Sequence, residues 1–134
     1  MFSLFEGAIN WMSKRQSVVA LSTTEAEYLA ATHASKEVFW LQILCSSMGL
    51  VQQAIRIPCD SQSAIFLAKN TAYHSKTKHI DVQYHFVRDM VEAKMVLLVK
   101  ADTLKNVANA LMKSVSTQNF SWCRETMGVE ELGQ

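Results

Sequence analysis

Two acidic segments carry the residues of this 134-residue chain that are best suited to chemistry. In the first, Glu25 and Glu27 follow a Ser-Thr-Thr triplet, and in the second, Asp60 directly follows the mostly apolar stretch 54–59. Carboxylates at the ends of different elements can hold hard divalent cations such as Mg²⁺ against a phosphodiester. The two segments therefore indicate a metal-dependent site that acts on nucleic acid.

Local signals predict the elements that position these carboxylates. Ser22 and Glu25 have the spacing of a capping box, which predicts a helix from there to Gly49. The capping role makes Glu25 the weaker candidate for chemistry. Asp60 ends a predicted strand over 54–59 and precedes a predicted helix over 61–70, so helix capping is the alternative role for Asp60. The apolar face of the first helix is expected to contain Leu29, His33, Val38, Leu41 and Leu44, with Trp40 beside it.

The remaining elements complete an α/β pattern. A hairpin is expected within residues 2–12, turning near Gly7, and a further strand over 18–21. An amphipathic helix is predicted over 80–91, a buried strand over 95–99, and helices over 106–113 and 119–127. Antiparallel strands followed by strand-helix crossovers favour an α/β fold. We expect one domain over 1–128 and a short tail over 129–134.

Composition excludes several classes of protein. Nearly half of the residues are apolar and 19% are charged, as in a globular domain, and the net charge of +1 restricts nucleic-acid binding to a local patch. The three cysteines are far apart and form no disulfide pattern, and no apolar run is long enough for a membrane helix. The N-terminus does not have the pattern of a signal peptide. These features predict an intracellular protein of the cytoplasm or nucleus.

Three motifs carry a resemblance to a known family. Ala26-Glu27-Tyr28-Leu29-Ala30, Asp60-Ser61-Gln62-Ser63-Ala64 and the His-Lys-rich run 74–81 resemble the ribonuclease H domain that closes the Pol polyprotein of copia-type LTR retrotransposons. The resemblance implies a ribonuclease H-like mixed sheet flanked by helices. It also implies Mg²⁺-dependent hydrolysis of the RNA strand of an RNA–DNA hybrid. Glu27 and Asp60 match catalytic and metal-binding positions, and an upstream reverse transcriptase region is the implied partner.

Two departures from the family pattern argue against full activity. Where the family has a further metal-binding aspartate, this chain has Asn109, whose neutral amide removes one negative charge from the site. The family's first strand, with its aspartate, is expected to be missing, so that the domain is truncated at its N-terminus. These departures predict impaired catalysis as an isolated chain. The alternatives are a non-catalytic nucleic-acid-binding remnant and a relic without function.

Basic residues after the second acidic segment suggest a contact with the phosphate backbone. The candidate residues are Lys76, Lys78, His79 and Arg88. The alternative is that they form the solvated start of a helix. A zinc site that uses His74, His79, His85 and Cys59 is disfavoured, because the spacing of these residues does not match known zinc motifs.

Overall fold

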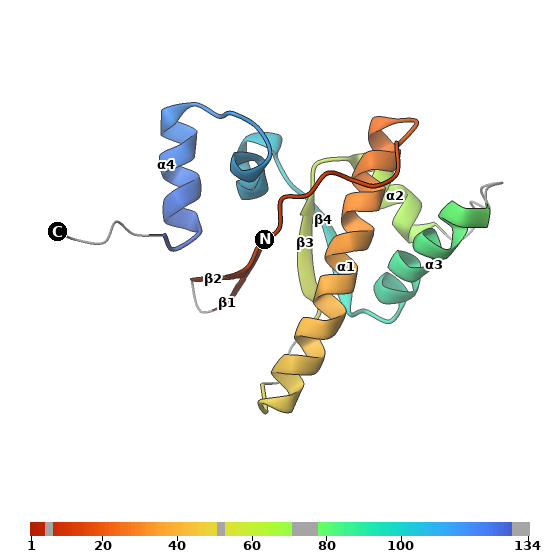
Figure 1. The fold of residues 1–134 in the computed structure, drawn as a ribbon. Helices are drawn as coiled ribbons and strands as arrows, with labels where there is room; N and C mark the ends of the chain where they lie inside the picture. Colours follow the sequence, from red (N-terminus) through yellow and green to blue (C-terminus); the bar gives the residue numbers. More distant parts are fainter. Residues whose placement is uncertain (5–6, 51–52, 71–77, 130–134) are drawn as a thin grey trace. The chain divides into compact units, whose positions relative to one another are not determined.

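The computed structural model describes residues 1–4, 7–50, 53–70 and 78–129, with the backbone alone for 78–84 (Figure 1). The described chain divides into two compact units, one made of Met1–Ser17 and Asp102–Gln134 and the other of Val18–Ala101. The central unit contains α1 (Thr23–Ser47), β3 (Ile55–Cys59), α2 (Gln62–Lys69), α3 (Lys78–Glu92) and β4 (Val96–Lys100). The terminal unit contains β1 (Phe2–Leu4), β2 (Gly7–Asn10), the 3₁₀ turns η1 (Thr103–Lys105) and η2 (Val107–Leu111), and α4 (Thr117–Thr126).

A parallel pair of strands forms the centre of the Val18–Ala101 unit. β3 and β4 pair in register from Ile55 opposite Val96 to Cys59 opposite Lys100. α1 packs against β3, α2 and α3, and α2 packs against both strands (Figure 1). Tyr28, Val38, Val87 and Val96 are completely buried where these elements meet. This apolar core fixes the ends of β3 and β4 relative to the first turns of α1 and α2.

The long helix α1 begins and ends where the sequence predicted. The Ser22 hydroxyl accepts a hydrogen bond from Glu25 N at 3.1 Å, and Glu25 Oε2 accepts one from Leu21 N at 2.6 Å. At the other end, Gly49 has a φ of 76°, a left-handed conformation that glycine adopts without strain. The expected apolar face is partly wrong, because His33 and Leu44 are exposed.

The terminal unit has a smaller core. β1 and β2 form the predicted antiparallel hairpin, and Ala8 N donates to Met127 O at 3.1 Å, which connects the hairpin to the end of α4. Of the described residues in this unit, only Cys123 and Asn109 are buried. The predicted helix over 106–113 is wrong in type, because Val107–Leu111 forms 3₁₀ turns.

The strand predicted over 18–21 is also wrong. Val19 and Leu21 are 86% and 90% exposed, and the Leu21 N–H is bonded to Glu25. Since a strand requires a neighbouring strand to satisfy its backbone groups, an apolar run without one remains irregular. The α/β class is confirmed, and the described strands form one antiparallel pair and one parallel pair, in different units. The ribonuclease H-like mixed sheet stays a prediction. Within the described ranges, no helix combines the length and apolar character needed to cross a membrane.

Candidate functional site

Glu27 lies in the second turn of α1 and is half-buried. Its neighbour Glu25 is buried, and the Glu25 carboxylate is used by the hydrogen bond from Leu21 N that closes the start of the helix. This bond is a variant of the capping box, since its donor lies one residue before the N-cap Ser22. The structure thus gives Glu25 a structural role in the start of α1, and Glu27 stays the candidate for chemistry.

Asp60 follows the last residue of β3 and precedes α2. The alternative capping role for Asp60 is wrong, because the N-cap is Ser61, whose hydroxyl accepts from Ala64 N at 3.2 Å. The half-buried Asp60 carboxylate is therefore not used to cap α2. On the neighbouring strand, Lys100 Nζ donates to the backbone carbonyl of Asp60. Both residues lie at the carboxyl ends of parallel strands, the edge at which α/β sheets commonly bind ligands.

Charged groups around these strand ends change the pKa of the Cys59 thiol. Burial raises the pKa of the Cys59 thiol, and the negative charges of Glu27 and Asp60 raise it further. A hydrogen bond with the backbone of Ser61 and the positive charge of Lys100 act in the opposite direction. Asp60 follows Cys59 directly in the chain, and α1, which carries Glu27, packs against β3. The charges of both carboxylates therefore act on the same thiol.

Cys59 and Lys100 are the residues of this region that sequence reasoning did not single out for the site. The available signal was the strand register, since Cys59 pairs with Lys100 and Ala101 N donates to Cys59 O at 3.0 Å. Two short strands that run in parallel bring their last residues together. Their alignment, however, depends on tertiary packing, which the sequence pattern does not specify.

Asn109 belongs to the terminal unit and is 6% exposed. The side-chain Nδ2 donates to Thr103 O at 2.5 Å. The backbone carbonyl of Asn109 accepts hydrogen bonds from Met112 N and Lys113 N. The amide therefore has a structural role, connecting η1 to η2. An aspartate at this position would lack the Nδ2 donor.

The predicted backbone-binding residues are described only in part. Lys76 lies outside the described residues, and Lys78 and His79 lie in the first turn of α3, where the backbone alone is described. Arg88 is half-buried, and its Nε donates to Leu67 O at 3.4 Å, which connects α3 to α2. The phosphate-binding role of these four residues stays a prediction.

The donor set around Asp60 fits one divalent cation better than two. In the part of the chain that the structure describes, no group of three or more His, Cys, Asp or Glu side chains is arranged to hold a metal ion. Mg²⁺ is commonly bound by one or two carboxylates together with water and substrate phosphates. Glu27 and Asp60 satisfy this lower requirement, whereas a two-ion centre needs more negative charge than this pair supplies.

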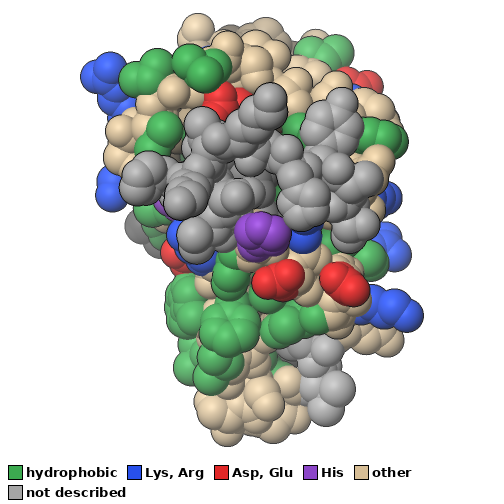
Figure 2. All heavy atoms as spheres, turned by 90° about the vertical axis from the view of Figure 1, so that its right-hand side faces the viewer, with side chains coloured by type: hydrophobic (Ala, Val, Ile, Leu, Met, Phe, Trp, Pro, Cys, Tyr) green, Lys and Arg blue, Asp and Glu red, His purple; other side chains and the backbone are tan. Residues whose placement is uncertain are grey.

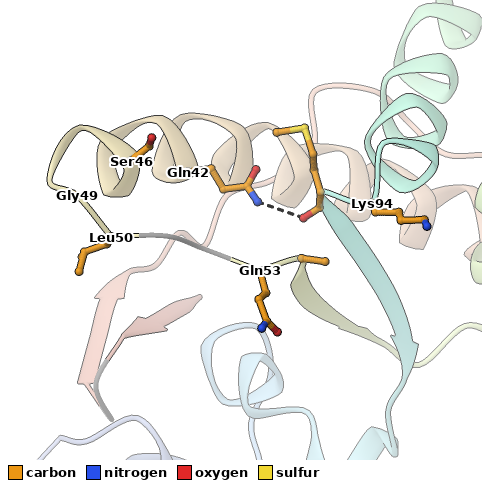
Figure 3. Close-up of a pocket in the computed structure, with 8 residues that line it drawn as sticks. Gln42, Ser46, Gly49, Leu50, Gln53 and Lys94 are labelled. Atoms are coloured by element: carbon orange, nitrogen blue, oxygen red, sulfur yellow. Dashed lines mark hydrogen bonds between the residues drawn. The ribbon is translucent and has the colours of Figure 1, made fainter.

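A separate hollow of about 420 Å³ lies between the C-terminal part of α1 and the start of β4 (Figure 3). Gln42 Nε2 donates to Met95 O at 3.3 Å, while the buried Gln42 Oε1 has no hydrogen-bond partner. Lys94 supplies the one charged side chain among the lining residues. Without a carboxylate pair, this hollow does not have the chemistry predicted for the site at Asp60.

Comparison with known proteins identifies the relatives of this chain. It is 48% identical over 129 residues to the "Retrovirus-related Pol polyprotein from transposon TNT 1-94" of Nicotiana tabacum, covering 96% of this chain and 10% of that protein. The Pol polyproteins from transposons RE1 and RE2 of Arabidopsis thaliana are 34% and 37% identical, over 92% and 84% of this chain and 8% of each relative. No protein-family model and no solved structure matches the chain. Over nearly its whole length, this chain is thus homologous to a segment of about a tenth of retrovirus-related Pol polyproteins from transposons.

Proposed function

We propose that this chain is the ribonuclease H segment of a copia-type Pol polyprotein and that it binds RNA–DNA hybrids at the Glu27–Asp60 pair. The observation that carries the proposal is the position of Asp60 directly after β3, the strand against which α1 packs. The effect of both carboxylates on the pKa of Cys59 supports it. The homology to Pol polyproteins supports the same function. In a longer Pol chain this segment would act next to the reverse transcriptase region.

The chemistry of the proposed site follows from its side chains. Glu27 and Asp60 supply oxygen ligands for one Mg²⁺, which when bound neutralises phosphate charge and lowers the pKa of a coordinated water. The nearby Lys100 ammonium adds positive charge for a phosphate of the RNA strand. Lys76, Lys78, His79 and Arg88 are the proposed contacts to the backbone of the hybrid. The proposed reaction is hydrolysis of the RNA strand.

Hydrolysis by this chain is expected to be slow or undetectable. The described residues provide a carboxylate pair and not a larger acidic group, and Asn109 replaces the charge of the family's late aspartate. Two divalent cations near each other need compensating negative charge, and each missing carboxylate weakens their binding. Binding of the hybrid without cleavage is therefore the second candidate function, favoured by the amide at position 109.

The test compares binding and cleavage of a labelled RNA–DNA hybrid by the whole chain, with Mg²⁺ and with EDTA. We expect Mg²⁺ to strengthen hybrid binding, measured by fluorescence anisotropy, and Glu27→Gln and Asp60→Asn each to remove most of that gain. Glu92→Gln is the matched control, because Glu92 is an exposed carboxylate on α3 in the same unit. Equal Mg²⁺ effects in all four proteins would refute the proposed site. Strong cleavage that survives Glu27→Gln would refute its catalytic role.

A further inference from the structure

The C-terminal half of α1 exposes an unusual amount of apolar surface. Here we call this surface the α1 face, which consists of Phe39, Trp40, Ile43 and Leu44 of α1 and of its C-cap residue Met48. These side chains are between 43% and 57% exposed, whereas Val38, Leu41 and Cys45 on the opposite side of the helix are buried. In Figure 2, apolar side chains gather over the lower part of the molecule, where Figure 1 places this half of α1. A helix that is apolar on both sides is typical of one that is buried on both sides.

We propose that the α1 face is a homodimer interface, in which two copies of α1 pack antiparallel about a two-fold axis between Leu41 and Gln42. The proposal is independent of the function proposed above. It rests on the spacing, the charges and the area of the α1 face.

The spacing of the α1 face is self-complementary. Lys36, Trp40, Ile43 and Ser47 follow one another at intervals of four, three and four residues, which gives a single stripe along a helix. In an antiparallel pair centred between residues 41 and 42, Trp40 of one copy lies opposite Ile43 of the other, twice in each dimer. Trp40 is already oriented within its own helix, because its Nε1 donates to Glu37 Oε2 at 2.6 Å. The indole ring can therefore pack without leaving its N–H unpaired.

The charges at the edges of the α1 face allow this arrangement. The same two-fold axis places Lys36 opposite Ser47 and Glu37 opposite Ser46, so that no like charges meet. In a parallel arrangement, each Lys36 would instead lie beside the other Lys36. The charges therefore favour the antiparallel dimer, whose two copies present the same surface to each other.

The area is sufficient for a weak, reversible dimer. Five large side chains, each about half exposed, present roughly 500 Å² per copy, which is at the upper end of the largest apolar patch on a typical monomer. Two copies together bury at most roughly 1,000 Å² through these side chains, which is the lower limit for a specific interface. We therefore expect a dimer whose population depends on protein concentration.

The first test is the mass of the whole chain in solution as a function of concentration, by sedimentation equilibrium. We expect the average mass to rise from 15.1 kDa toward twice that value. Ile43→Glu should raise the dissociation constant at least about tenfold, because it introduces a carboxylate twice into the apolar seam. Phe66→Glu is the matched control, because Phe66 is exposed to a similar extent on α2 of the same unit. A chain that is monomeric at every concentration would overturn the proposal, as would equal effects of the two variants.

The second test determines the register. Trp40→Lys and Ile43→Glu are each expected to be monomeric alone, with helix content unchanged by circular dichroism. Mixed in equal amounts, they should form a heterodimer, because position 40 of one chain then pairs with position 43 of the other as Lys with Glu. The remaining Ile43–Trp40 contact of that heterodimer is native. A mixture that stays monomeric would overturn the antiparallel register.

Discussion

The substitution Asn109→Asp tests the structural role of the amide at this position. In the native chain the Nδ2 of Asn109 donates to Thr103 O at 2.5 Å, and the side chain is almost fully buried. An aspartate removes this donor and places a carboxylate against the carbonyl oxygen it bonded. Losing one hydrogen bond costs about 1 kcal/mol, and a buried charged group without its partner costs about 1–3 kcal/mol more. We therefore expect Asn109→Asp to lower the free energy of unfolding by roughly 2–4 kcal/mol.

The assay is urea unfolding, followed by circular dichroism and by hydrogen exchange of peptides covering residues 103–113. Asn109→Ala serves as the matched control, because it also removes the donor but adds no charge, and it should cost about 1–2 kcal/mol. An Asn109→Asp variant as stable as the native chain would refute the structural role derived from the Thr103 contact.

Three further predictions concern the Val18–Ala101 unit. Ser22→Ala removes the N-cap of α1 and should cost about 1 kcal/mol in thermal unfolding; an unchanged melting temperature would contradict this. Glu27→Gln removes a negative charge that raises the pKa of Cys59, so the thiolate should form at lower pH. Alkylation of Cys59, measured by mass spectrometry at mildly alkaline pH, should therefore be faster than in the native chain, whereas Glu92→Gln should leave the rate unchanged. Arg88→Met removes the bond from Nε to the carbonyl of Leu67 in α2 and should cost about 1 kcal/mol, with reduced hydrogen-exchange protection at the end of α2.

Elements with local signals could be predicted from the sequence. The capping interaction of Ser22 and Glu25 defines the start of α1, and the left-handed Gly49 follows its end. The position of Asp60 after β3 could also be predicted, because an apolar run followed by polar residues indicates a strand end. These signals depend on a few adjacent residues, so they can be interpreted without knowledge of the tertiary structure.

Features that depend on distant partners could not be predicted in this way. Residues 18–21 have the composition of a strand but lack a neighbouring strand, and Val107–Leu111 forms 3₁₀ turns in place of an α-helix. The neighbourhood of Cys59 and Lys100 depends on the register of two strands about forty residues apart. The exposure of Leu44 likewise depends on which side of α1 the rest of the unit covers, since both sides are apolar.

The capping of α2 by Ser61 has a consequence for how such a segment changes over generations. Since the hydroxyl of Ser61 satisfies the first turn of α2, the helix does not need the carboxylate of Asp60. Selection for folding alone would therefore not act against a mutation that removes this carboxylate. In a copy of the segment that is no longer selected for chemistry, Asp60 is then free to drift while Ser61 is retained. Such a copy would keep the first turn of α2 after the carboxylate is lost.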